Sequence, residues 1–172
     1  MKHCYLIGGT MGVGKTTVCQ LLKKRLPNAV FLDGDWCWDA DPFQVTEETK
    51  MMVVDNICHL LNNFLSCSVY DNIIFCWVMH QQEIIDDICS RLNLSEAKLH
   101  CISLICDEDS LCQRLKKDVA DGVRQEDVIA RSVQRLPLYE KLKSEKVDTT
   151  TKSPEEIAAF IAEKSTFTLL NA

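Results

Sequence analysis

The sequence predicts one α/β domain over residues 1–172, with a sheet of parallel strands covered by helices on both faces. Short apolar runs alternate with apolar residues at helical spacing along the whole chain. The run at residues 72–79, NIIFCWVM, is apolar on both faces, as a central parallel strand should be. The composition is globular, with 47% hydrophobic and 26% charged residues, and six Gly and four Pro leave little room for linkers.

The first half of the chain predicts a strand, a helix, a second strand and a long helix in turn. Residues 3–7 form a short apolar run that ends in two glycines. Apolar residues at helical spacing follow until Pro27, so a helix is expected from about residue 14 to 26. A second run at 29–32 stops at a turn-forming Asp-Gly-Asp segment, and an amphipathic helix covers about 46–66.

The second half continues the alternation after the strand at 72–79. Helices are expected at about 84–92, 107–117 and 126–143, and strands at 99–105 and 146–149. Ser153-Pro154-Glu155-Glu156 is a capping box with proline at the first helical position, so a last helix begins there. In such a sheet, ligands bind beyond the carboxyl ends of the strands.

Charge and cysteine content exclude several classes of protein. Lys and Arg number 19 against 25 Asp and Glu, a net charge of −6, whereas a protein that coats a nucleic acid polymer needs a basic excess. No apolar stretch approaches the roughly 20 residues of a membrane span. The ten cysteines include no CxxC pair, and the chain opens as a strand rather than as a signal peptide. We therefore expect a cytoplasmic protein with reduced thiols and no His/Cys metal site, of unknown oligomeric state.

Residues 9–16, GTMGVGKT, fit the phosphate-binding pattern G-x-x-x-x-G-K-[ST] without a mismatch. An apolar strand precedes the segment and an amphipathic helix follows it, as this motif requires. Glycines let backbone N–H groups turn inward to form an anion nest, and the helix N-terminus adds its dipole. We expect Lys15 to reach the β- and γ-phosphates and the Thr16 hydroxyl to serve Mg²⁺. The spacing disfavours a dinucleotide fold, which needs G-x-G-x-x-G.

Four features make the chain resemble the small P-loop kinases and phosphotransferases, such as shikimate kinase, gluconate kinase, adenylylsulfate kinase and chloramphenicol phosphotransferase. They are the loop at 9–16, the turn at 33–35, the basic segment from Arg114 to Arg124 and the turn at 147–150. The resemblance implies a P-loop NTPase three-layer sandwich with a five-stranded parallel sheet in the order 2-3-1-4-5. It also implies ATP and Mg²⁺ as cofactors and an arginine-bearing lid at about 114–127. The residues expected to bind the nucleotide are Gly9, Thr10, Met11, Gly12, Val13, Gly14, Lys15, Thr16, Thr17, Arg114 and Thr150.

Asp33 and Asp35 supply the carboxylates that phosphoryl transfer requires beside the nucleotide. Asp35 is the candidate to orient the acceptor hydroxyl and accept its proton, and Asp33 is the candidate to hold Mg²⁺ with Thr16. The two acids are interchangeable in these roles on sequence grounds, and an Asp-Gly pair is also a common turn dipeptide. The strand at 72–79 ends without a Walker B acid. Mg²⁺ must therefore rely on Thr16, the two acids and water.

Arg114 and Arg124 are expected, with Lys15 and Asp35, to form the catalytic set. By resemblance the two arginines close over the triphosphate and stabilise the charge that develops during transfer. A solvated basic helix face is the alternative interpretation of these arginines. Arg131 and Arg135 lie four residues apart and either face the same cleft or point to solvent.

The region expected to hold the acceptor is poor in cations and rich in aromatic residues. Residues 26–90 contain one lysine and no arginine, although an anionic acceptor is usually gripped by an arginine fork. Trp36, Trp38 and Trp77 lie near the expected pocket with His80, and they either contact the acceptor or pack in the core. We therefore expect a neutral or cationic small molecule as the acceptor.

Together these patterns predict an ATP-dependent small-molecule kinase that transfers the γ-phosphoryl group to an alcohol group. A nucleoside or nucleotide kinase is the first alternative, and a non-catalytic ATP-binding regulatory protein is the second. A GTPase is disfavoured because no N-K-x-D guanine motif occurs in the chain.

Overall fold

A computed structural model describes residues 1–167, and a five-stranded sheet forms its centre. The strands are β1 (Lys2–Gly8), β2 (Ala29–Asp33), β3 (Asn72–Cys76), β4 (Ala97–Ile105) and β5 (Glu145–Asp148). Every neighbouring pair is parallel, and the order across the sheet is β2-β3-β1-β4-β5. The predicted sheet order is therefore confirmed.

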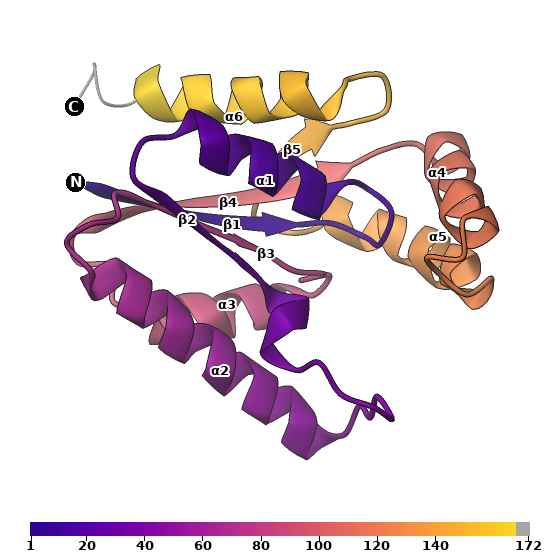
Figure 1. Cartoon of the computed structure of the whole chain (residues 1–172), viewed down its shortest axis with the longest axis horizontal. Helices are drawn as coiled ribbons and strands as arrows, with labels where there is room; N and C mark the ends of the chain where they lie inside the picture. Colours follow the sequence, from indigo (N-terminus) through magenta and orange to yellow (C-terminus); the bar gives the residue numbers. More distant parts are fainter. Residues whose placement is uncertain (168–172) are drawn as a thin grey trace.

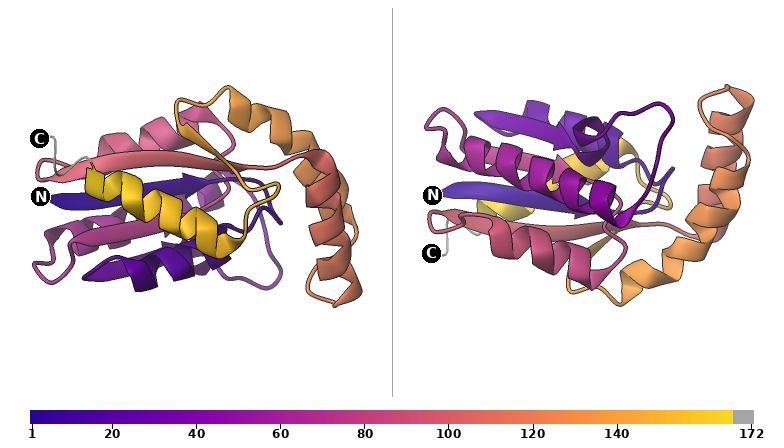
Figure 2. Two further views of the ribbon diagram at one scale, coloured as in Figure 1. Left: turned by 90° about the horizontal axis from the view of Figure 1, so that it is seen from above. Right: turned by 90° about the horizontal axis from the view of Figure 1, so that it is seen from below.

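The helices form two layers and one projecting pair (Figures 1 and 2). They are α1 (Lys15–Arg25), α2 (Glu47–Ser66), α3 (Gln82–Arg91), α4 (Glu108–Ala120), α5 (Asp127–Glu140) and α6 (Pro154–Phe167), with a short 3-10 helix, η1 (Gly34–Cys37). Helices α1 and α6 cover one face of the sheet, and α2 and α3 cover the other (Figure 1). The pair α4–α5 projects beyond the carboxyl ends of the strands, where Figure 2 shows it as an arm beside the loops.

Burial on both faces explains why the central strands are apolar throughout. Along β1, Cys4 and Leu6 face the core beneath α2 and α3, whereas Tyr5 and Ile7 face the core beneath α1 and α6. All four side chains are at most 1% exposed. Burial of a large apolar side chain contributes about 1.5–3 kcal/mol, so the strand is held from both sides.

Capping residues fix the starts of two helices as the sequence indicated. The Thr46 hydroxyl accepts from the Thr49 N–H at 3.1 Å, and the Thr49 hydroxyl accepts from the Thr46 N–H at 2.8 Å, before α2. The Glu156 carboxylate accepts from the Ser153 N–H at 2.7 Å, and the Ser153 hydroxyl accepts in return at the start of α6. Each pair satisfies N–H groups that a helix end leaves without a backbone acceptor.

The predicted strand at 72–79 was wrong beyond Cys76. Trp77 N still donates to the Ile7 carbonyl at 3.3 Å, but Met79 adopts a φ of 39°, which turns the chain away from the sheet. Trp77 and His80 therefore lie in the loop after β3. The helix predicted at 126–143 ends at Glu140, where the Lys141 N–H donates to the Leu138 carbonyl at 3.3 Å and the α-helical pattern gives way to a tighter turn.

Across residues 1–167 no helix has the length and apolar character of a transmembrane segment. All ten cysteines are within the described chain and are free thiols.

Candidate active site

The loop from Gly9 to Gly14 joins β1 to α1 at the carboxyl edge of the sheet. Gly12 has a φ of 81°, and a Cβ there would come within 2.5 Å of Leu115 Cδ2 in α4, so the backbone packs directly on that helix. Gly14, with a φ of 101°, is the N-cap of α1. Among the described residues no side chain caps α1, which leaves its first N–H groups for an anion.

The Lys15 side chain lies inside this loop. Its ammonium donates to the Thr10 carbonyl at 3.0 Å. Burial lowers the pKa of Lys15, and the carboxylates of Asp35 and Asp33 act in the opposite direction. The charged amine therefore faces two carboxylates in a poorly hydrated site, where a bound polyanion would stabilise its charge.

Asp33, at the end of β2, joins the loop to the acidic turn. One carboxylate oxygen accepts from the Thr16 hydroxyl at 2.8 Å, and the other accepts from the Asp35 N–H at 3.1 Å. The same residue is 7% exposed and also accepts from the Cys76 thiol at 3.5 Å. Its position is therefore set by three elements, α1, η1 and β3.

The Thr16–Asp33 pair fits Mg²⁺. A hydroxyl and a carboxylate are hard oxygen ligands, and Mg²⁺ is usually held by one or two carboxylates together with substrate phosphates and water. Among residues that the structure describes, no three His, Cys, Asp or Glu side chains form a metal cluster. The donor set thus suits a cation shared with a phosphate rather than an all-protein cage.

Asp35 lies on η1, the short 3-10 helix that directly follows β2. Its Oδ1 accepts from the Trp77 Nε1–H at 3.2 Å. Loss of hydration raises the pKa of Asp35 above its ordinary value, and the Asp33 carboxylate raises it further. The charges of Lys15 and Arg124 and the Trp77 hydrogen bond oppose that rise. A carboxylate with a raised pKa, held by a rigid indole, is suited to accept a proton.

The indole of Trp77 packs directly on the backbone of Gly34. A Cβ at Gly34 would lie 2.5 Å from Trp77 Cγ. A Gly34→Ala substitution should therefore displace the indole and break its hydrogen bond to Asp35. We expect a loss of about 1–3 kcal/mol in the free energy of unfolding, together with a lower kcat and little change in ATP affinity. Thermal unfolding and steady-state kinetics measure both effects.

Gly8→Ala is the matched control for this substitution. The added Cβ would meet only ordinary contacts, at 3.7 Å from Met79 and beyond. An unchanged stability and kcat in Gly34→Ala would show that Trp77 does not hold Asp35 in place.

The predicted arginines lie in different environments. Arg114 is tied down, because its guanidinium donates to the Thr149 carbonyl at 2.6 Å and to the Thr149 hydroxyl at 3.0 Å. Arg124 pairs with Asp118 at 3.1 Å in the segment between α4 and α5. Its charge also lowers the pKa of Lys15 and of Asp35, which places Arg124 within electrostatic reach of the site.

The second arginine pair is divided by the fold. Arg131 forms an exposed ion pair with Asp127 at 3.0 Å. Arg135 lies near His80, whose pKa is lowered by burial and by the Arg135 charge. The His80 Nδ1 is buried and has no hydrogen-bond partner among the described residues. Arg135 thus faces the loop after β3, whereas Arg131 faces solvent.

Thr150 lies on the far side of the loop from the acids. Its hydroxyl accepts from the Asp107 N–H at 3.0 Å, and its own N–H donates to the Asp148 carboxylate at 2.8 Å. Together with the Arg114–Thr149 contacts, these bonds join the ends of β4 and β5 to the start of α4.

The three tryptophans do not form one cluster. Trp38 and Trp77 pack edge to face with ring centroids 6.2 Å apart. Trp36 is 58% exposed and packs on Phe31, which belongs to the core on the opposite face of the sheet. Trp38 and Trp77 are thus near Asp35 on one side, and Trp36 lies on the other.

Two contacts from α5 to the site were absent from the sequence analysis. The Thr10 hydroxyl donates to the Ser132 carbonyl at 3.0 Å, and the Tyr139 hydroxyl donates to the Val78 carbonyl at 2.6 Å. The only sequence signal for Tyr139 is its place on the apolar side of a helix. Both contacts link residues more than 60 positions apart, so local patterns carry no trace of the pairing.

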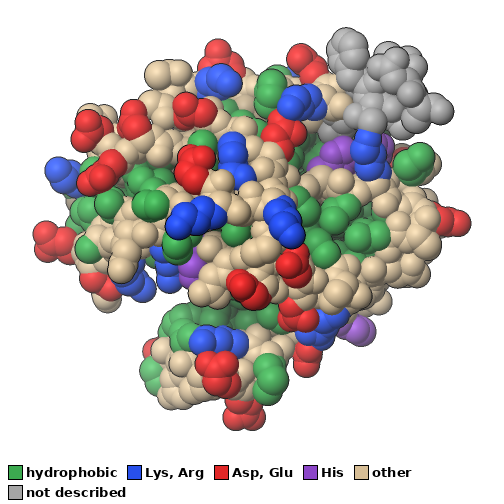
Figure 3. All heavy atoms as spheres, turned by 180° about the vertical axis from the view of Figure 1, so that it is seen from behind, with side chains coloured by type: hydrophobic (Ala, Val, Ile, Leu, Met, Phe, Trp, Pro, Cys, Tyr) green, Lys and Arg blue, Asp and Glu red, His purple; other side chains and the backbone are tan. Residues whose placement is uncertain are grey.

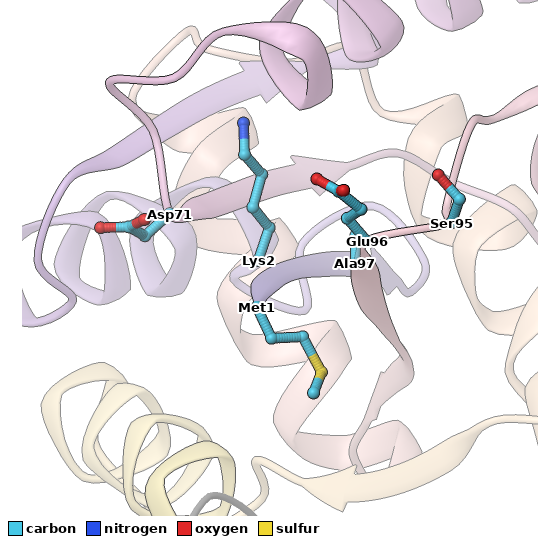
Figure 4. A pocket seen from close by; sticks show the side chains of 6 residues that line it. All are labelled: Met1, Lys2, Asp71, Ser95, Glu96 and Ala97. Carbon is cyan, nitrogen blue, oxygen red and sulfur yellow. The ribbon is translucent and has the colours of Figure 1, made fainter.

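A hollow of about 530 Å³ lies at the opposite end of the sheet. Its lining includes Met1, Lys2 at the start of β1, and the segment Ser95, Glu96 and Ala97 before and at the start of β4. In Figure 4 the side chains of Met1 and Lys2 point in opposite directions, and Ser95 lies apart from both. The Lys2 ammonium donates to the backbone carbonyls of Leu65 and Cys67. The polar groups that line the hollow therefore do not point toward a common ligand position.

Many solved structures match this fold. The tunicamycin resistance protein of Deinococcus radiodurans matches with a TM-score of 0.70 at 19% identity over 96% of each chain. A gluconokinase from Sinorhizobium meliloti 1021 gives 0.66 at 16%, over 96% of this chain and 97% of that one. The APS kinase of Mycobacterium tuberculosis, in complex with AMPPNP and APS, gives 0.65 at 11%, over 94% and 96%. The search of curated proteins finds no match.

The fold and the glycine-rich loop define a protein of the P-loop class. The sequence model described as "AAA domain" matches residues 6–135, and the chain belongs to that family. The resemblance to small P-loop kinases and phosphotransferases is thereby confirmed.

Proposed function

We propose that the protein is an ATP-dependent kinase that transfers the γ-phosphoryl group to a hydroxyl of a neutral or cationic small molecule. The observation that carries the proposal is the placement of Asp35. Its carboxylate is held by Trp77 at 3.2 Å and lies within electrostatic reach of Lys15. A phosphate-binding loop beside a second carboxylate of raised pKa is the arrangement that in-line transfer to an alcohol requires.

In this proposal the loop and Lys15 hold the triphosphate of ATP. Mg²⁺ held by Thr16 and Asp33 would neutralise charge on the phosphate oxygens. Asp35 orients the acceptor hydroxyl and accepts its proton as the oxygen bonds to the γ-phosphorus. The bond between that phosphorus and the bridging oxygen breaks, and ADP leaves.

The lid in this proposal is the segment at about 114–127. At the start of this segment, Arg114 donates to Thr149 in the turn after β5. Arg124, near its other end, lies within electrostatic reach of Lys15. Closure would exclude water and bring Arg124 onto the transferring phosphoryl group. Arg114 is suited to contact the nucleotide from its fixed position, together with Thr150. We place the reaction in the cytoplasm, where ATP is available and free thiols persist.

A panel of acceptors tests the function. With ATP and Mg²⁺, we expect phosphorylation of neutral or amine-bearing alcohols and at least about tenfold lower kcat/KM for nucleoside monophosphates and hydroxy acids. The physical reason is that residues 26–90 offer one lysine and no arginine to an anion. Mass spectrometry of the products, with ADP release as the rate, measures the preference. Exclusive use of nucleoside monophosphates would favour the nucleotide kinase alternative, and ATP binding without transfer to any acceptor would favour the regulatory one.

A further inference from the structure

A hollow of about 250 Å³ lies between the loop that follows η1 and the first turns of α2. Apolar side chains from both segments form one part of the lining, and polar side chains form the remainder. The apolar residues are Trp38, Ala40, Pro42, Phe43 and Met52, and the polar ones are Asp39, Gln44 and Thr49.

Large apolar side chains are exposed around this hollow. Phe43 is 58% exposed, Met52 44% and the neighbouring Met51 64%. Single exposed apolar residues are normal on a protein surface, but several at the rim of one hollow indicate a binding surface. Figure 3, seen from behind, shows hydrophobic side chains along the recess between the lower lobe and the rest of the molecule.

A row of aromatic rings joins the hollow to the carboxylate of Asp35. The indole of Trp77 donates to Asp35, and the Trp38 ring packs against it at 6.2 Å between centroids. The Phe43 ring then packs on Trp38 at 4.7 Å. A molecule whose hydroxyl reaches Asp35 would therefore find a continuous apolar wall leading into the hollow.

The charges around the hollow favour a cation over an anion. Asp39 lines it, and Asp41, Glu47 and Glu48 are exposed on the same loop and helix start. Lys50 is the one lysine of this region, and it pairs with Glu47 at 2.8 Å. An aromatic wall with acidic groups beside it attracts amines and repels carboxylates and phosphates.

We propose, resting on the kinase function above, that this hollow holds an apolar, ring-sized body of the acceptor. The acceptor is then an amphipathic hydroxylated amine rather than a polyol, a hydroxy acid or a nucleotide. The hydroxyl oxygen bonds to the γ-phosphorus of ATP, its proton passes to Asp35, and ADP leaves with the electrons of the broken phosphorus–oxygen bond.

Three simple alcohols separate the contributions of ring and charge. Phenylalaninol carries a ring, an amine and a hydroxyl, alaninol lacks the ring, and phenyllactate replaces the amine with a carboxylate. With ATP and Mg²⁺, kcat/KM for phenylalaninol should exceed that for alaninol by at least about tenfold, because burial of a phenyl ring is worth that much. Phenyllactate should be used no better than alaninol.

The Phe43→Ala and Met52→Ala variants test whether the hollow causes this preference. Each should lower the phenylalaninol-to-alaninol ratio at least threefold and leave the KM for ATP unchanged. Val69→Ala, at a residue that is 65% exposed in the segment between α2 and β3, is the control and should keep the ratio. Thermal unfolding verifies that each variant is folded.

Equal use of phenylalaninol and alaninol, or a ratio unaffected by both variants, would overturn the inference and leave the kinase function standing. Absence of transfer to all three probes would also overturn it, and the broader acceptor panel then decides whether the protein is a kinase. Sedimentation of the wild type and of Phe43→Ala adds one further readout. The inference would be overturned if the wild type formed a dimer that Phe43→Ala does not form, and if the wild type did not prefer phenylalaninol to alaninol. The apolar rim would then be the contact surface for a second copy of the chain.

Discussion

Replacing Asp35 with asparagine is expected to lower kcat by about 10²–10⁴-fold, the usual contribution of a positioned general base. The affinity for ATP and Mg²⁺ should remain within about threefold, because Asp35 contacts neither the loop backbone nor Thr16. Asparagine keeps an Oδ1 that accepts from Trp77, so the geometry of the turn is preserved. Initial rates and a calorimetric titration with ATP and Mg²⁺ measure the two quantities.

Asp109→Asn is the matched control, since it removes the same charge from an exposed residue in the first turn of α4. Its kcat should be unchanged within twofold. The thermal stability of Asp35→Asn should equal or exceed that of the wild type at neutral pH. The folded state raises the pKa of Asp35, so the ionised carboxylate costs stability once the pH rises through that pKa, and asparagine removes the cost. A normal kcat in Asp35→Asn would remove Asp35 from the mechanism.

The same carboxylate predicts the acid limb of the pH profile. Proton transfer requires ionised Asp35, so activity is lost as the pH falls through its pKa. Loss of hydration and the Asp33 carboxylate raise that pKa, so the decline should begin at a higher pH than an ordinary aspartate would give. A profile of kcat/KM against pH measures it. A limb at the ordinary aspartate pKa would show that another group controls the reaction.

Replacing Lys15 with methionine should have the second large effect. We expect ATP affinity to fall at least about tenfold and kcat to fall by about 10²–10³-fold, the usual cost of one donor that stabilises a developing oxyanion. The ammonium lies inside the loop, 3.0 Å from the Thr10 carbonyl, and burial lowers its pKa. Methionine keeps the length of the side chain and removes only the charge and its donors.

Lys24→Met is the control for this variant, because it makes the same change at an exposed position in the last turn of α1. ATP binding and kcat should be unaffected there. Both variants should unfold within a few degrees of the wild type, since the ammonium of Lys15 is a poorly hydrated charge whose removal relieves the fold. Undiminished ATP affinity in Lys15→Met would mean that the loop does not hold the polyphosphate.

Local sequence patterns were sufficient to predict those features that depend on residues close together in the chain. In the loop at 9–16, the glycines adopt positive φ, a conformation that glycine accepts without a steric penalty. The spacing of the glycines in the sequence therefore predicted where the backbone turns. The capping box at Ser153 was equally readable, since donor and acceptor lie three residues apart. The strand order followed from the resemblance alone, and the alternation of strands and helices predicted that the strands are parallel.

Long-range contacts determined the rest of the site. An apolar run could not show that the chain turns away from the sheet at Met79, because residues that are buried in a loop and residues that are buried in a strand are equally apolar. The basic segment could not distinguish Arg114, which bonds to Thr149, from Arg124, which pairs with Asp118. Trp36 and Trp38, two residues apart in the sequence, likewise lie on different faces of the sheet, and Trp38 packs on the distant Trp77.

From the sequence alone came the α/β class, the phosphate-binding loop, the acidic turn and the cation-poor acceptor region, since composition and short-range spacing encode each of them. The tertiary structure alone decided that Trp77 bonds to Asp35, that α5 contacts the loop, and that a hollow opens beside Trp38, whose ring packs on Trp77. Those features arise where strands and helices that are distant in the chain pack together. Such packing depends on how the side chains of different elements fit against one another, and the pattern of residues within one element does not determine that fit.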